Sequence, residues 1–188
     1  MQNVLVVSSG EKAKAFFDEM LNETEYGTKV YAYSCGEARR LLIERTFDLC
    51  VINAPLSDES GEKFATQIIG DKADQVILIV KAELAEEVTA KVEDYGVFVL
   101  AKPFTRQSFF MVYKMAEATY RRINGVKTEN DKLKRMLGEI KLISRAKCFL
   151  VEKEFITEEE AHKIIEKRAM ETRKTRGEVA AEILKKYE

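Results

Sequence analysis

Residues 48–53 read Asp-Leu-Cys-Val-Ile-Asn, and Leu49–Asn53 form a short and mostly apolar run that ends on a polar side chain. Similar runs occur in the first hundred residues at 3–8, 30–33, 76–80 and 97–101. Short runs that are rich in β-branched residues and apolar on both faces are typical of strands buried in a parallel sheet. Stretches with helical character lie between them, at residues 11–21, 36–45, 62–69 and 83–95. The alternation predicts an α/β fold, a doubly wound parallel five-stranded sheet.

The length and composition of the chain limit the alternatives. Its 188 residues allow one medium domain, or one ordinary domain and a small one. It has no apolar stretch near the roughly 20 residues that a membrane helix needs, and its N-terminus lacks the pattern of a signal peptide. Cys35, Cys50 and Cys148 are too few and too scattered for a disulfide framework or a zinc site. We therefore expect a cytoplasmic protein with no membrane partner.

The charge is divided unevenly along the chain, although the net charge is only −1. Residues 1–120 hold 13 Lys and Arg against 19 Asp and Glu, whereas residues 121–188 hold 18 against 13. A polyanion would therefore bind the C-terminal part. A solvated, highly charged helical face is the alternative that charge alone leaves open.

A long helix is predicted after Pro103, the last proline, from about residue 105 and for some 45 residues. Residues 119–140 form a connector whose apolar positions follow the 3-4 spacing of a coiled-coil seam: Ile123, Val126, Asn130, Leu133, Leu137 and Ile140. Asn130 falls at a position where a buried Asn pair favours two strands in register. The pattern predicts a coiled-coil homodimer, and an amphipathic helix that packs within its own chain is the alternative.

The tail predicts a small three-helix all-α module over residues 134–188. Two capping signatures, Thr157 with Glu160 and Thr175 with Glu178, mark the starts of its second and third helices. Apolar residues at helical spacing, such as Ala146 and Ile165, are expected to form its core. Phe149 and Phe155 are assigned to the core too, and Met170 is a further candidate.

Basic residues are expected on the outside of this module, namely Arg145, Lys147, Lys167, Arg168, Arg173, Lys174 and Arg176. Lys and Arg neutralise phosphates, and Arg also binds them in bidentate fashion. Three of the cations flank Thr175 at a helix N-terminus, which itself favours anions. Such runs are more often solvated than functional when charge is the only argument.

The tail resembles the ANTAR family, a three-helix module of bacterial transcription antiterminators that binds structured RNA. The resemblance rests on residues 144–151 (SRAKCFLV), 157–161 (TEEEA), 168–170 (RAM) and 179–183 (VAAEI). It implies a dimer that binds paired RNA hairpins through the basic residues above and so prevents a terminator stem from forming. Cys148 departs from the family, which usually has Gly there.

The first 118 residues resemble the receiver domain of response regulators, the phosphorelay proteins of two-component systems. The resemblance rests on residues 48–53 with Pro55 and Gly61 after them, and on Lys102-Pro103-Phe104. It implies a cis peptide bond before Pro103. It also implies a pocket where an acid pair holds Mg²⁺ and an aspartate accepts phosphate.

The chain departs from that chemistry at nearly every position of the pocket. Ser8 and Ser9 replace the acid pair, Asn53 replaces the phospho-acceptor and Lys81 stands where a Thr or Ser is usual, whereas Lys102 is retained. Mg²⁺ requires carboxylate oxygens, and an amide is no nucleophile toward an acyl phosphate. We expect a pseudo-receiver whose pocket is either inert, with Asn53 bonded to Lys102, or a site for an anion or small ligand.

No catalytic set, cofactor motif or metal-ligand spacing occurs in the sequence. His162, the only histidine, follows a run of glutamates and is expected to face water. We expect no enzyme and no cofactor, but an RNA-binding antitermination regulator with hairpin RNA as its partner and a regulatory protein or small ligand at the pseudo-receiver. A protein–protein adaptor and a DNA-binding response regulator are the alternatives.

Overall fold

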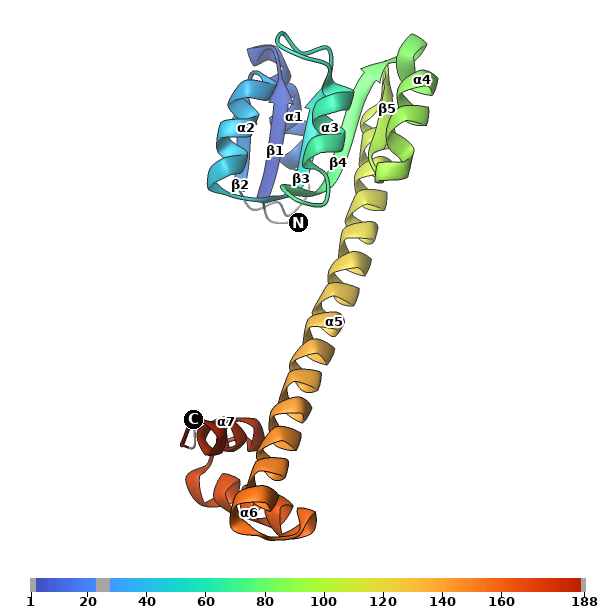
Figure 1. The fold of residues 1–188 in the computed structure, drawn as a ribbon. Helices are drawn as coiled ribbons and strands as arrows, with labels where there is room; N and C mark the ends of the chain where they lie inside the picture. Colours follow the sequence, from blue (N-terminus) through green and yellow to red (C-terminus); the bar gives the residue numbers. More distant parts are fainter. Residues whose placement is uncertain (1–2, 23–27, 187–188) are drawn as a thin grey trace. The chain divides into compact units, whose positions relative to one another are not determined.

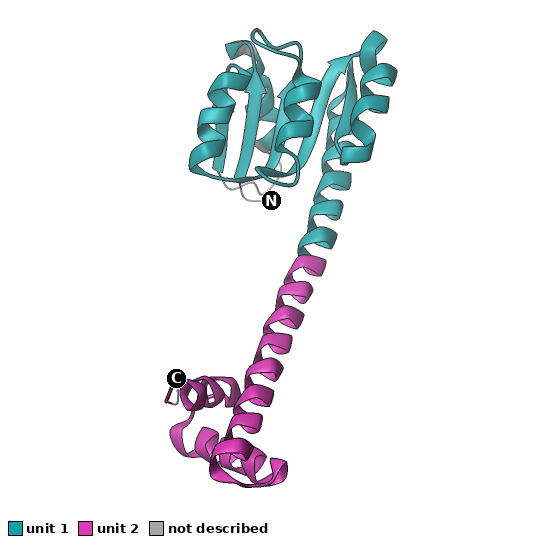
Figure 2. Cartoon of the chain, viewed as in Figure 1, with its two compact units in different colours: residues 1–124 teal, residues 125–188 magenta. Residues whose placement is uncertain are grey.

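The structure of the chain, a computed structural model, describes residues 3–22 and 28–186 (Figure 1). The chain divides into two compact units, residues 1–124 and residues 125–188 (Figure 2). The predicted pseudo-receiver (1–118) and three-helix module (134–188) each have a few residues outside the described ranges. Among the described residues, no helix combines the length and apolar character needed to cross a membrane.

The first unit contains a five-stranded parallel sheet in the order β2-β1-β3-β4-β5. Its strands are β1 (Asn3–Ser8), β2 (Thr28–Ala32), β3 (Phe47–Asn53), β4 (Ala73–Lys81) and β5 (Phe98–Lys102). This topology confirms the predicted doubly wound α/β class. Two register pairs matter below, because they align the carboxyl ends of the strands. Ser8 is the partner of Asn53, and Lys81 is the partner of Lys102.

Helices cover both faces of this sheet (Figure 1). The connecting elements are α1 (Glu11–Asn22), α2 (Cys35–Glu44), α3 (Gly61–Ile68), α4 (Ala82–Val92) and the 3₁₀ turn η1 (Glu93–Tyr95). One core forms between the sheet and α2, α3 and α4, and it includes the fully buried Phe64. The other forms against α1 and the first turns of α5 (Arg106–Glu154), around Phe17 and Phe109. The strands are apolar on both faces because both faces are covered.

Helix α5 has 49 residues, and its residues belong to both units. Proline would interrupt such a helix, and the last proline, Pro103, precedes it. The predicted long helix is therefore present, and it contains the whole proposed connector. The peptide bond before Pro103 is cis, as the receiver resemblance implies, and so is the one before Pro55.

The second unit adds α6 (Glu158–Thr172) and α7 (Arg176–Lys186) to the end of α5, and the three helices share one core. Its buried members alternate at helical spacing on all three helices: Ala146, Leu150, Ala161, Ile165, Ala169, Val179, Ala180 and Ile183. Both predicted caps form. The Thr157 and Glu160 side chains bond each other's backbone N–H groups, and Thr175 and Glu178 do the same.

Three residues assigned to this core lie outside it, and one of them is the half-buried Phe149, whose ring lies beside the Lys153 ammonium. Met170 is 75% exposed and Phe155 is 92% exposed. Met170 follows Ala169, which takes the inward position on α6. Phe155 lies in the short turn after α5, where the chain reverses before Thr157 and where no helix covers it.

Candidate nucleic-acid interface and the crevice of the sheet

The seven predicted RNA-binding residues all lie in the second unit, on or between its helices. Arg145 and Lys147 flank the buried Ala146 on α5, and Lys167 and Arg168 lie on α6 just before the buried Ala169. Arg173 and Lys174 form the turn between α6 and α7, and Arg176 begins α7. All are exposed except Lys147, which is half-buried.

Ion pairs divide these seven residues into two groups. Four of them pair with a glutamate: Lys147 with Glu158 (2.6 Å), Lys167 with Glu171 (3.9 Å), Arg176 with Glu166 (3.3 Å), and Lys174 with Glu182. Within the described part of the chain, Arg145, Arg168 and Arg173 form no ion pair. These three guanidinium groups can contact a phosphate without first giving up a carboxylate.

The turn between α6 and α7 is closed by backbone hydrogen bonds. Arg173 adopts a left-handed conformation (φ 55°), and the backbone N–H of Lys174 donates to the carbonyl oxygen of Ala169 at 3.1 Å. This is the usual way to satisfy the last carbonyl groups of a helix. The Thr175 cap then starts α7 at once, so three cations lie within four consecutive residues of a tight turn.

Phe155 is an aromatic residue that sequence reasoning misplaced. It too has a left-handed backbone (φ 53°), which disfavours a side chain of its size. The ring is almost fully exposed in the turn between α5 and α6. The available sequence signal was its position between a helix end and a capping box, where glycine is the common choice. Nearby, a concavity of about 420 Å³ is lined by Ser144, Lys147, Cys148, Val151, Glu152 and Glu158.

The proposed seam lies along α5. Its five apolar members are all half or more exposed: Ile123 50%, Val126 61%, Leu133 54%, Leu137 58% and Ile140 61%. Asn130 is exposed as well. A helical stripe of this length and exposure is unusual for a lone chain.

The degenerate pocket of the first unit lies at the carboxyl ends of the strands. The Asn53 amide donates to the Ser8 hydroxyl at 2.9 Å, and the Lys102 ammonium donates to the carbonyl oxygen of Ala54. The Ser9 hydroxyl donates to the carbonyl oxygen of Pro55 at 2.9 Å. The bond between Asn53 and Lys102 that was expected for an inert pocket is therefore replaced by two others.

Lys81 completes this group of residues. It is exposed, ends β4 and directly precedes α4. Burial, and next the charge of Lys81, lower the pKa of Lys102 below its usual range. The structure thus brings Ser8, Asn53, Lys81 and Lys102 to one edge of the sheet, and places Ser9 just beyond it.

These residues do not fit Mg²⁺, the ion that the receiver resemblance implies. The ion prefers carboxylate oxygens in a near-octahedral array, whereas Ser8, Ser9 and Asn53 offer hydroxyl and amide groups beside two cations. Throughout the described ranges, no group of three or more His, Cys, Asp or Glu side chains is placed to hold a metal.

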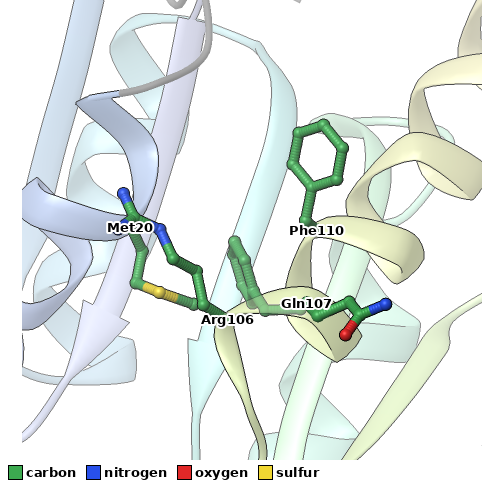
Figure 3. Close-up of a pocket in the computed structure, with 5 residues that line it drawn as sticks. Met20, Arg106, Gln107 and Phe110 are labelled. Atoms are coloured by element: carbon green, nitrogen blue, oxygen red, sulfur yellow. The ribbon is translucent and has the colours of Figure 1, made fainter.

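A separate cavity of about 360 Å³ lies where α1 ends and α5 begins (Figure 3). Met20, Arg106, Gln107, Phe109 and Phe110 line it. Figure 3 shows the Met20 and Arg106 side chains on one side of it and the Phe110 ring on the other. Arg106 also donates to the carbonyl oxygen of Glu19 at 3.4 Å. None of the predicted site residues lines this cavity.

Comparison with known proteins identifies the fold of the first unit and a family match in the second. The receiver domain of an HD domain-containing protein from Pseudomonas fluorescens Pf-5 covers 64% of this chain and 98% of its own, with a TM-score of 0.57 at 21% identity. The HemR receiver domain from Leptospira biflexa covers 62% and 94%, with a TM-score of 0.53 at 22% identity. Residues 131–184 match the ANTAR domain family. The chain therefore joins a receiver-type fold to an ANTAR domain.

Curated relatives align with most of this chain. The transcriptional regulatory protein PdtaR of Mycobacterium tuberculosis is 27% identical over 184 residues, which is 97% of this chain and 89% of PdtaR. The similarity thus extends across both units.

Proposed function

We propose that this chain is a transcription antitermination regulator that binds hairpin leader RNA as a dimer and does not act as an enzyme. The ANTAR domain match over residues 131–184 is the observation that carries the proposal. The name of PdtaR, a transcriptional regulatory protein, supports the regulatory class.

The surface of the second unit supports RNA as the partner. Arg145, Arg168 and Arg173 lie on three parts of that unit, are exposed and have no carboxylate partner within the described residues. Arg binds phosphate oxygens in bidentate fashion, and backbone contacts of this kind supply much of the affinity for nucleic acid.

Phe155 supplies a second kind of contact in this proposal. Proteins that recognise RNA loops stack unpaired bases on exposed aromatic rings. The Phe155 ring is 92% exposed and lies in the same unit as the basic residues. We assign it to an unpaired base of the hairpin loop.

The exposed seam on α5 supports the dimer. Two copies that align Leu133, Leu137 and Ile140 would remove these side chains from water, and Asn130 would set the register. A dimer would present two ANTAR domains to two hairpins of one leader, so that the second binding event becomes intramolecular.

The pocket of the first unit supports control without phosphoryl transfer. Asn53 offers an amide where a nucleophilic carboxylate is needed, and its Nδ2 group is bonded to Ser8. In this proposal the receiver-type unit senses a protein partner or a ligand and is not itself a substrate for a kinase.

The test is a salt titration of binding to a two-hairpin leader RNA, with a scrambled RNA and a DNA duplex of equal length beside it. We expect tight binding to the hairpins alone. The R168E/R173E variant should bind about tenfold or more weakly and should lose about two from the slope of log affinity against log salt. The matched control is R40E/K63E, which reverses two exposed cations of the first unit.

Three outcomes would contradict the proposal. Equal and salt-suppressed binding to all three nucleic acids would leave a protein–protein adaptor. A preference for duplex DNA would identify a DNA-binding response regulator. Loss of binding in the control variant would move the interface to the first unit.

A further inference from the structure

Two lysines meet at one edge of the sheet in the first unit. Lys81 ends β4 and Lys102 ends β5, and the two are direct partners in the parallel register. Both strands end at the crevice where open α/β sheets commonly bind ligands. Asn53 and Ser8 end the next two strands along the same edge, β3 and β1.

The charges of the two ammonium groups are not balanced by ion pairs within the described residues, and Glu83 is the acidic residue in the adjoining first turn of α4. The acidic residues of the loop that follows β3 are engaged elsewhere. Asp58 accepts the backbone N–H groups of Cys35 and Gly36 at 3.0 and 2.8 Å, and Glu59 pairs with Arg39.

Of the two lysines, the half-buried Lys102 is the one whose charged state is less favourable. Among the described residues its ammonium donates to a neutral partner, the carbonyl oxygen of Ala54, and Lys81 is its neighbour in the strand register. Two like charges near each other, one of them partly removed from water, raise the free energy of the charged state. A bound anion would reverse the sign of that interaction.

Neutral groups at this edge can donate hydrogen bonds, beside the exposed Glu83 in the first turn of α4. The Ser8 hydroxyl accepts from the Asn53 amide, so its own hydrogen stays available to a further acceptor. Helix α4 begins directly after Lys81, and no side chain caps it. Its first backbone N–H groups add donors to those of the two lysines.

We propose that this crevice binds a phosphate group, as inorganic phosphate or a phosphomonoester, non-covalently and without a divalent cation. Lys81 and Lys102 supply the charge, and Ser8 supplies a neutral hydrogen bond. A tetrahedral dianion fits two cations and several donors where a metal ion fits poorly. Ligand binding would then act on the ends of β4 and β5 and on the start of α4. The inference is independent of the proposed RNA function.

The test is calorimetric titration of the full chain with inorganic phosphate, and separately with glycerol phosphate, at constant ionic strength and with EDTA present. We expect saturable binding to the wild-type protein and about tenfold weaker binding to Lys81→Ala. Lys63→Ala is the control, because Lys63 is an exposed cation on α3 of the same unit. The two ligands separate a free ion from a phosphomonoester as the preferred form.

Phosphate can also bind the basic turn of the ANTAR domain, so a second variant keeps the two sites apart. R168E/R173E should retain the full response to phosphate if the crevice is the site. Retained binding in Lys81→Ala, loss of binding in R168E/R173E, or a strict requirement for Mg²⁺ would each overturn the proposal. Absence of any binding by the wild-type protein would do so as well.

Discussion

Phe155 combines a backbone conformation that favours glycine with a large aromatic side chain. The conformation is left-handed, and the ring has almost no contact that would offset the strain. A residue that is unfavourable for folding and fully available to solvent has the features of a functional position. Sequence reasoning placed it in the core because it judged the residue type and not the conformation that the turn imposes.

We predict that Phe155→Gly stabilises the second unit by about 1 kcal/mol, since glycine adopts this conformation without strain. The same change should weaken binding to hairpin RNA several-fold, because a stacked base is lost. Chemical denaturation and a binding titration measure the two effects. Phe155→Tyr should retain RNA affinity. Unchanged affinity in Phe155→Gly would remove the ring from the interface.

Helices α6 and α7 depend on reciprocal caps for their starting points. Thr157 and Thr175 each satisfy a backbone N–H group that has no partner within the helix, and each is bonded in return by a glutamate. These contacts define both boundaries, which is why the sequence alone predicts them well.

We predict that Thr157→Ala lowers the free energy of unfolding of the ANTAR domain by about 1 kcal/mol, the usual effect of losing a threonine cap. Denaturant titration followed by helix content measures it. Thr157→Ser, which keeps the hydroxyl group, is the control. A loss of equal size in the serine variant would mean that the methyl group and not the cap is responsible.

We also predict that these caps weaken in acid. The backbone N–H groups of Thr157 and Thr175 lower the pKa values of Glu160 and Glu178 below the usual range. A lowered folded-state pKa means that the stabilisation is present above the unfolded value of about 4.3 and is lost as pH falls through the folded value. E160Q/E178Q should therefore be less stable than wild type at pH 7 and show a flatter loss of helix content on acidification. Parallel curves would show that other carboxylates dominate.

The strands show what sequence patterns can and cannot provide. β1 has the predicted bounds, because its apolar run begins and ends with polar residues. β4 begins at Ala73, three residues earlier than expected. The polar residues Asp74 and Gln75 interrupt the apolar pattern from which the start of the strand was predicted. Gln75 is only 2% exposed, so a polar residue here is buried by its neighbours. The edge strand β2 begins with Thr28 and Lys29, and its polar start likewise displaced the prediction.

In the candidate sites, too, the sequence predicts which residue types are present but not how most of them are paired. The basic residues and the departures at Ser8, Asn53 and Lys81 are visible in the sequence. Which cations are paired with glutamates is visible only for Lys167 and Glu171, which lie four residues apart on α6, because the other three pairs join residues on different helices or turns. The Lys147–Glu158 pair, for example, links α5 to the first turn of α6.

At the scale of the whole molecule, dimerisation would bring each exposed residue of the α5 seam against the same residue of the second chain. We predict that L133E/L137E is monomeric by light scattering, because paired carboxylates in a seam repel each other and are removed from water. Its affinity for a two-hairpin RNA should fall toward that for a single hairpin. Lys132→Glu changes the charge by the same amount away from the seam and should remain dimeric. An unchanged dimer in L133E/L137E would place the contact elsewhere.

The three cysteines differ sharply in their surroundings. Cys35 and Cys50 are buried, and burial raises the pKa of Cys35 to about 12 and that of Cys50 further, whereas Cys148 is exposed on α5. A thiol reacts as its thiolate and only where reagents can reach it. A maleimide dye should therefore label the native chain at a single position, beside Lys147 in the ANTAR domain, with no engineered cysteine. The chain thus contains its own attachment point for a fluorescent reporter with which the proposed RNA binding can be measured.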